Sequence, residues 1–178
     1  MMRKRVLLSW SGGKDSALAL QALRADPNIE VAGLLTSVTR DYERISVHGV
    51  RRSLLERQAE RLRLPLFTIE LDPVTTNDAY ESAFLSALER VQRDLPGVTA
   101  IAFGDLFLAD VRVYCERLLD ELPSTVDPCG ERGEFHTFVS DGPGYEGPVE
   151  YAVGDTVLRD ERFAYCDLVP PEESGATQ

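Results

Sequence analysis

Strand-like and helix-like segments alternate along the first hundred residues of this 178-residue chain. Four short apolar runs that are typical of buried strands occupy residues 5–10, 30–37, 66–71 and 99–103. Between them apolar residues recur with helical spacing, most clearly over 80–91, and Pro65 and Pro96 mark returns to strand. Repeated βα units of this length predict an α/β fold, a parallel sheet with helices on both faces.

A glycine loop lies where the first predicted strand meets the first predicted helix. It reads SGGKDS over residues 11–16. Its two glycines let an anion approach the backbone, and the following helix N-terminus offers unpaired N–H groups and a partial positive charge. Lys14 adds a mobile charge, and Ser11 and Ser16 add hydroxyl donors. The loop is therefore interpreted as a phosphate cradle, with an ordinary turn capped by Ser11 as the alternative.

The residues around this loop exclude two commoner phosphate-binding motifs. A Walker A loop needs Gly at position 8 and Ser or Thr after the lysine, where this chain has Leu8 and Asp15. A dinucleotide-binding fingerprint needs Gly at the position of Lys14. Only two of the 19 basic residues are lysine, so a lysine inside the loop is unusual for this composition.

Composition narrows the class of protein. At 43% hydrophobic and 28% charged residues, the chain resembles a soluble globular protein. We expect neither a signal peptide nor a membrane span, and a cytoplasmic location. The three cysteines are widely spaced and include no CxxC pair, which disfavours a disulfide framework, a zinc site and cysteine-dependent sulfur transfer.

The net charge of −11 is concentrated in the last third of the chain. Residues 1–117 hold 16 basic and 16 acidic side chains, whereas 118–178 hold 3 and 14. A negative surface is a poor footprint for nucleic acid, so we expect no nucleic-acid partner. Positive charge is concentrated in residues 40–63, which contain seven arginines. Its role is left open between a solvated surface and a site for phosphate or an acidic partner.

Ligands of parallel sheets bind beyond the carboxyl ends of the strands. At those ends Thr36 and Ser37 are candidates for holding adenine or ribose, and His48 is a candidate phosphate donor or a plain helix-start residue. Gly104–Asp105 follows the fourth strand, where Asp105 either caps a helix or contacts ribose or a metal. Arg112 follows on the same expected helix face.

A second motif, DPCGERGEFHTFV, spans residues 127–139. Strand alternation would place Glu134, His136 and Phe138 on one side, close to Glu131. Two carboxylates and an imidazole so close can bind a cation or ammonium, or transfer protons. A plain edge strand with polar residues facing water is the alternative reading.

The C-terminal third is predicted to be a small β region. Runs at 149–157 and 163–169 predict an antiparallel hairpin, and residues 171–178 a disordered tail. The expected organisation is an α/β core with the glycine loop over 1–117, an acidic region with the second motif and the hairpin over 118–170, and the tail.

Four motifs in order resemble those of the diphthine:ammonia ligase family and its bacterial PP-loop relatives. They read LSWSGGKDSALAL, HGVRRSLLERQA, FGDLFLADVR and DPCGERGEFHTFV and span residues 7–139. The resemblance implies a Rossmann-like adenine nucleotide alpha-hydrolase fold of the ATP pyrophosphatase superfamily. It also implies an ATP-dependent ligase that adenylates a carboxylate, releases pyrophosphate, and lets ammonia displace AMP. In eukaryotic and archaeal relatives the carboxylate is the diphthine side chain of an elongation factor.

The resemblance also implies a set of site residues. Expected ATP-binding residues are Ser9, Ser11, Gly12, Gly13, Lys14, Asp15, Ser16, Thr36, Ser37, His48, Gly104, Asp105 and Arg112. Expected catalytic residues are Lys14, Asp15, Glu131, Glu134 and His136, the last three at the acceptor or ammonia site. Asp15 or Asp105 is the candidate ligand for Mg²⁺.

The chain departs from the family between Arg112 and the second motif, where relatives carry a further βα unit. The acceptor carboxylate and the oligomeric state are therefore left open. Two alternative functions also remain, a non-catalytic adenine-nucleotide-binding regulatory module and a PP-loop sulfurtransferase.

Overall fold

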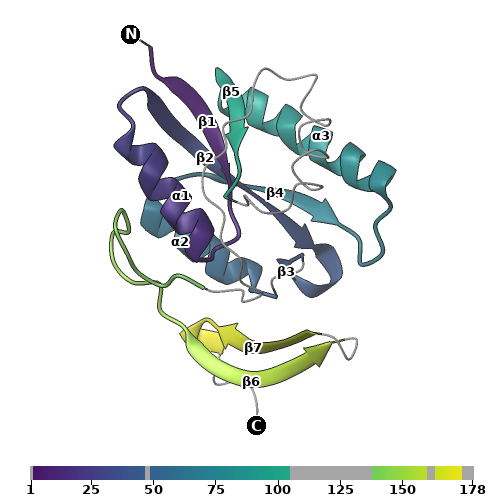
Figure 1. The fold of residues 1–178 in the computed structure, drawn as a ribbon. Helices are drawn as coiled ribbons and strands as arrows, with labels where there is room; N and C mark the ends of the chain where they lie inside the picture. The colour runs from purple at the N-terminus through teal and green to yellow at the C-terminus, as the bar shows by residue number, and fades with distance from the viewer. Residues whose placement is uncertain (1, 47–48, 105–137, 160–162, 174–178) are drawn as a thin grey trace.

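The computed structural model describes residues 2–46, 49–104, 138–159 and 163–173 (Figure 1). The strands and helices of the N-terminal part are β1 (Lys4–Ser9), α1 (Lys14–Ala25), β2 (Ile29–Thr39), β3 (Arg44–Ile45), α2 (Arg52–Leu62), β4 (Leu66–Leu71), α3 (Asn77–Asp94) and β5 (Val98–Ala102). A 3₁₀ turn, η1 (Arg40–Tyr42), links β2 to β3. The C-terminal part contains β6 (Ala152–Arg159), β7 (Phe163–Val169) and the 3₁₀ turn η2 (Pro171–Glu173).

The main sheet is mostly parallel, and its parallel strands follow the order β4-β2-β1-β5. Successive strands add outward from β1 to β2 to β4, and the chain then returns to place β5 on the far side of β1. The strand order therefore reverses at β1, between β2 and β5. This confirms the predicted Rossmann-like α/β class, and it marks the crevice in which such sheets bind ligands.

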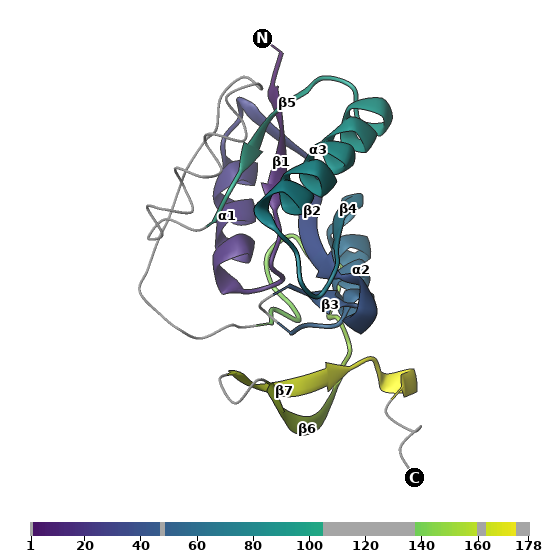
Figure 2. The same ribbon diagram turned by 90° about the vertical axis from the view of Figure 1, so that its right-hand side faces the viewer.

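Helices cover both faces of the sheet, as expected. Figure 2 shows α1 and α3 on opposite sides of β1. One buried cluster joins the sheet to α1 and α2 and includes Val6, Leu8, Trp10, Leu20, Leu23, Leu34, Leu55 and Leu62. The other joins it to α3 and includes Leu7, Leu35, Ile69, Phe84, Leu88, Val91 and Ile101. The change of face at α3 is what right-handed crossovers require when the chain reverses direction along a sheet.

The short strand β3 extends the sheet beyond the end of β1. Val38 and Thr39 of β2 pair in parallel with β4 and antiparallel with β3, so β3 lies on the edge of β2 that β1 occupies further down. The Ser46 amide continues this edge by donating to the Ser37 carbonyl at 3.0 Å. The sequence did not predict β3, because two residues carry no periodicity.

The C-terminal hairpin was predicted and is present. β6 and β7 pair antiparallel, and in both Figures 1 and 2 they lie beyond the carboxyl ends of β1 and β2. The first strand begins at Ala152 rather than at 149, and Val149 is instead buried, with its amide bonded to the Ser140 carbonyl.

Residues 171–173 were expected to begin a disordered tail and instead form η2, where Glu172 forms an ion pair with Arg57. This pair fixes the start of the segment on α2. The rest of the predicted tail, 174–178, lies outside the described residues.

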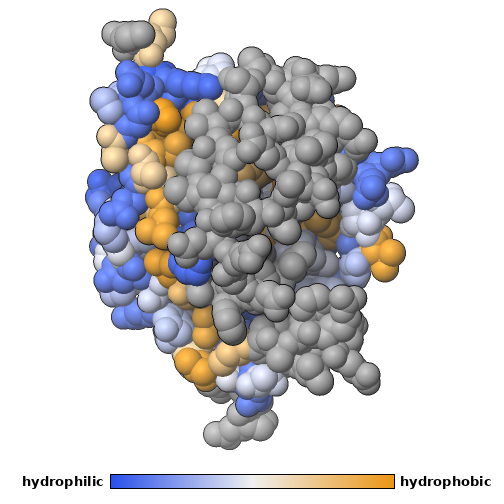
Figure 3. Space-filling model, in the orientation of Figure 1, coloured by the Kyte–Doolittle hydropathy of each residue, from blue (hydrophilic) through white to orange (hydrophobic). Residues whose placement is uncertain are grey.

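On the face drawn in Figure 3, the described surface is hydrophilic at the left rim, with an apolar band further in. Within the described ranges, no helix combines the length and apolar character that crossing a membrane would need.

Candidate functional site

The glycine loop lies at the reversal point of the sheet. It connects the carboxyl end of β1 to the start of α1, between β2 and β5. Trp10, between the end of β1 and the glycine loop, is buried and donates its amide to the Leu35 carbonyl of β2 at 2.7 Å. The sheet thus holds the loop at the position where α/β proteins bind phosphate-containing ligands.

Hydroxyl groups and backbone form the interior of the loop. The Ser16 hydroxyl donates to the Gly13 carbonyl at 3.0 Å, and the Ser11 hydroxyl donates to Ser16 Oγ at 3.1 Å. Gly13 is the N-cap of α1 and supplies no side chain to the first turn, whose N–H groups have no partner within the helix. The Gly13 amide reaches Ser11 Oγ over a long 3.4 Å. Such an arrangement can bind a phosphate with backbone donors and two hydroxyls.

The glycine loop carries two charged side chains, which form an ion pair with each other. Lys14 Nζ donates to Asp15 Oδ1 at 2.7 Å, and each side chain is 45% exposed. An exposed pair of this kind contributes little stability, so it separates at low cost when a ligand arrives. Lys14 can then meet a phosphate. Mg²⁺ in nucleotide sites uses one or two carboxylates together with phosphate oxygens, and the accessible Asp15 carboxylate fits that requirement.

Gly104, at the end of β5, lies against the start of α1. A Cβ on Gly104 would come within 3.3 Å of the Asp15 carbonyl oxygen and 3.4 Å of the Ser16 nitrogen. Glycine therefore permits close contact between the β5 end and the helix terminus that forms the cradle. The fold brings Gly104 and the glycine loop together.

Thr36 and Ser37 lie beside the loop on β2. They directly follow Leu35, whose carbonyl accepts from Trp10, and Thr36 is 4% exposed while Ser37 is half-buried. Ser9 is the last residue of β1 and pairs with Leu35. The remaining predicted site residues lie outside the described residues: His48, Asp105, Arg112, Glu131, Glu134 and His136.

Sequence reasoning missed Gln58 of α2, which is 0% exposed and contacts the loop. Its amide nitrogen donates to the Gly12 carbonyl at 3.0 Å and to the Val139 carbonyl at 2.7 Å. Its amide oxygen accepts from Trp10 Nε1 at 2.9 Å. The signal was present, because Gln58 interrupts the buried stripe of α2 formed by Leu54, Leu55, Ala59 and Leu62.

The end of the second motif also contacts the glycine loop. The Val139 amide donates to the Gly12 carbonyl at 2.9 Å, and its own carbonyl accepts from Gln58. Residues 127–137 of the same motif are outside the described residues. The structure therefore anchors the second motif at the phosphate cradle through its final residue.

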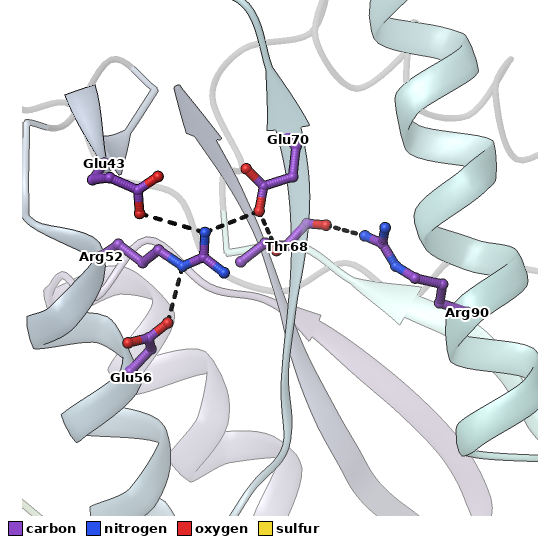
Figure 4. Close-up of polar contacts among 6 residues, drawn as sticks. All are labelled: Glu43, Arg52, Glu56, Thr68, Glu70 and Arg90. Atoms are coloured by element: carbon purple, nitrogen blue, oxygen red, sulfur yellow. Dashed lines mark hydrogen bonds and ion pairs between the residues drawn. The ribbon is translucent and has the colours of Figure 1, made fainter. Parts of the chain in front are cut away.

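The arginines near the start of α2 are engaged by carboxylates of the protein. Arg52 contacts Glu56 at 2.9 Å, Glu70 at 3.0 Å and Glu43 at 3.4 Å (Figure 4). Burial favours a lower pKa for Arg52, but the Glu56 hydrogen bond and the three negative charges outweigh it and raise that pKa. Arg52 is thus part of an ion-pair network within the protein, which is neither of the two roles left open for this stretch.

The same network extends toward the core through Glu70 and Thr68. The Thr68 hydroxyl donates to Glu70 at 3.0 Å, and Arg90 of α3 donates to the Thr68 carbonyl (Figure 4). Arg52 is thereby tied to β4 and, through Thr68, to the helix on the opposite face.

Two further arginines hold the C-terminal hairpin. Arg44 of β3 and Arg51 before α2 both bind the Asp167 carboxylate of β7, at 2.8 Å and 2.9 Å. Hydrogen bonding from Arg51, helped by Arg44, outweighs burial and lowers the pKa of Asp167 below its ordinary value. The hairpin is thus attached next to the strand ends that flank the glycine loop.

Comparison with known proteins agrees with this geometry. Residues 2–123 match the family model described as the diphthamide synthase N-terminal domain. The matched range includes the glycine loop, Gln58 and Gly104, and it ends before the second motif. No curated protein matches the chain.

Proposed function

Because the chain belongs to the diphthamide synthase N-terminal domain family, a group of ATP-utilising PP-loop enzymes, we propose that it is an ATP-dependent amide ligase. A carboxylate oxygen of the acceptor attacks the α-phosphorus of ATP, and the bond to the β-phosphate breaks to release pyrophosphate. Ammonia then attacks the acyl carbon, loses a proton, and displaces AMP. The observation that carries the proposal is the glycine loop at the reversal point of the sheet, with backbone, hydroxyl and lysine donors in one place.

The proposed chemistry needs charge stabilisation rather than a protein nucleophile. Negative charge moves onto the leaving pyrophosphate as the α–β bond breaks, and preorganised donors stabilise that charge. In this proposal the N–H groups at the start of α1, the hydroxyls of Ser11 and Ser16, and Lys14 receive the β- and γ-phosphates. Asp15 would hold Mg²⁺, which would supply positive charge to the phosphates when bound. Thr36 and Ser37 contact the nucleoside.

The acceptor and ammonia residues are proposed from the second motif. Val139, the last residue of that motif, donates its amide to the Gly12 carbonyl of the glycine loop. This supports Glu131, Glu134 and His136 as the groups that orient the acceptor or take a proton from ammonium. The same proposal divides the chain into an ATP-binding core over 1–117 and an acidic C-terminal region over 118–170 that carries the second motif and the hairpin.

The reaction can be tested by incubating the protein with Mg²⁺, ATP, ¹⁵N-ammonium and a panel of carboxylic acids. Mass spectrometry should find AMP, pyrophosphate and a ¹⁵N-amide in equal amounts with one acceptor. Lys14→Ala should lose most of the turnover, because the transition state loses a positive charge at the phosphates. Lys4→Ala is the matched control, since Lys4 is the only other lysine and lies at the opposite end of β1.

Other outcomes would support other functions. ATP binding without AMP under every condition would sink the ligase proposal and favour a regulatory nucleotide-binding module. AMP formation that depends on a persulfide donor instead of ammonium would favour the sulfurtransferase. Full activity of Lys14→Ala would mean that the loop does not bind the phosphates in the proposed way.

A further inference from the structure

Gln58 is a polar side chain in the apolar face of α2, and both its amide nitrogen and its amide oxygen have hydrogen-bond partners. It is 0% exposed and forms bonds to three partners, Trp10, Gly12 and Val139. A buried amide that lost these partners would be strongly unfavourable, whereas an aliphatic side chain would continue the apolar stripe of α2 without needing any hydrogen-bond partner. Its presence in the core points to a specific role at the loop that it touches.

Trp10 determines which way the Gln58 amide faces. The indole nitrogen is a donor only, so it must meet the amide oxygen, and the bond is 2.9 Å long. The amide nitrogen then necessarily faces the carbonyls of Gly12 and Val139. The orientation of the amide therefore follows from its partners.

The contact with Gly12 orients the peptide bond that joins Gly12 to Gly13. In a planar trans peptide the C=O and the following N–H point in opposite directions. The Gly12 carbonyl is held toward α2 by two donors, Gln58 Nε2 at 3.0 Å and the Val139 amide at 2.9 Å. The Gly13 N–H consequently points away from α2 into the loop, where its acceptor is Ser11 Oγ at 3.4 Å.

We propose that Gln58 is a positioning residue that, by holding the Gly12 carbonyl, aims the Gly13 N–H at the pyrophosphate portion of ATP and ties the second motif to the same peptide. This inference rests on the proposed function, because it assigns a donor to the phosphates that the ligase would release. A ligand oxygen replaces the long contact to Ser11 with a charge-assisted hydrogen bond. Gln58 itself touches no phosphate.

One NMR signal reports on this peptide alone. Gly12–Gly13 is the only Gly-Gly step in the sequence, so protein carrying both ¹³C-carbonyl glycine and ¹⁵N-glycine gives a single carbonyl–amide cross-peak. Titration of the wild-type protein with inorganic pyrophosphate should shift the Gly13 amide proton downfield to saturation. An unmoved peak in protein that releases AMP and pyrophosphate would overturn the inference and leave the ligase proposal standing.

Variants of Gln58 separate positioning from plain packing. Gln58→Leu removes the donor, and Gln58→Glu keeps the shape but replaces the donor by a carboxylate. In either folded variant pyrophosphate binding should weaken by about tenfold or more, the loss of one charge-assisted hydrogen bond, and the Gly13 peak should no longer follow the titration. Gln92→Leu is the control, because the Gln92 amide also donates to a backbone carbonyl, that of Val98, on the α3 face.

The outcomes distinguish the two proposals. Folded Gln58 variants with lower melting temperatures but unchanged pyrophosphate affinity and an unchanged Gly13 response would overturn the positioning role. If both variants fail to fold, the wild-type titration still decides, because the inference requires the Gly13 amide to respond. A wild-type protein that binds neither ATP nor pyrophosphate refutes the proposed function together with this inference.

Discussion

Two separate features of the structure favour glycine at position 12 of the loop. Its φ is +75°, a region that L side chains rarely adopt, and a Cβ there would lie 2.7 Å from Gln58 Oε1 and 2.9 Å from Leu55 Cδ2. Both neighbours are buried side chains of α2, so neither can move without disturbing the core. The loop and α2 are therefore packed as one unit.

Gly12→Ala should consequently destabilise the protein by about 2–4 kcal/mol, the sum of left-handed backbone strain and overpacking. Urea unfolding followed by circular dichroism measures the change. Gly142→Ala is the matched control, because a Cβ there meets nothing within 4 Å, and its stability should stay within about 0.5 kcal/mol of wild type. Equal stabilities of the two variants would show that Gly12 is not restricted by α2.

The residues of the loop were predictable, whereas their partner on α2 was not. Ser11 to Ser16 lie together in sequence, and strand, glycines and helix follow one another in the order that a phosphate cradle requires. Gln58 is 46 residues from Gly12, and only the packing of α2 against the loop brings the two together. Patterns in the sequence indicate local structure only. The long-range contact of Gln58 is visible in the sequence only as a polar residue within the apolar stripe of α2.

Among the elements, the hairpin has a specific attachment to the α/β part. Asp167 of β7 lies between Arg44 and Arg51, and its side chain is 15% exposed. Removing the carboxylate would take away the negative charge that both arginines contact. The two ion pairs of Asp167 therefore hold the hairpin next to β3 and the start of α2.

Asp167→Asn should lower stability at pH 7 by about 2 kcal/mol, less than for a fully buried pair because Arg51 is 31% exposed. The pKa of Asp167 is lowered in the folded protein, so its contribution is complete above the unfolded pKa of about 3.9 and is lost as pH falls through the folded value. The difference in melting temperature between wild type and variant should thus narrow below about pH 4.

Asp155→Asn serves as the control for this comparison, because Asp155 is exposed on the neighbouring strand β6. Its melting temperature should match the wild type across the same pH range. A difference for Asp167→Asn that is constant down to pH 2 would mean that the carboxylate charge does not stabilise the attachment.

At this scale the sequence predicted the regular elements and missed the contacts between them. Each of the four parallel strands was placed within two residues of its observed limits, because apolar runs bounded by Gly and Pro are local signals. The strand β3 is too short to show a period. The ion pair between Arg51 and Asp167 joins residues 116 positions apart and has no local signature.

Across the molecule, the acidic C-terminal third supplies carboxylates to part of the arginine-rich stretch 40–63. Glu146, Asp167 and Glu172 form ion pairs with arginines of that stretch. The sequence showed an excess of acidic residues in this third. Some of these carboxylates hold the C-terminal segment against β3 and α2 through ion pairs. The glycine loop lies at the junction, since its Gly12 carbonyl is bonded both to α2 and to Val139.

The glycine loop is bonded to α2 and to the segment at Val139. ATP bound at the loop should therefore stabilise the whole protein and not only the loop. A ligand that binds only the folded state contributes about 2.7 kcal/mol at a concentration 100 times its dissociation constant, or about 5–10 °C in melting temperature for a chain of this size. Lys14→Ala should reduce this shift strongly, whereas Lys4→Ala should retain it. Differential scanning fluorimetry with Mg²⁺ and ATP measures both. An equal shift in the two variants would place the triphosphate away from Lys14, and the loop would then not be the phosphate cradle of this enzyme.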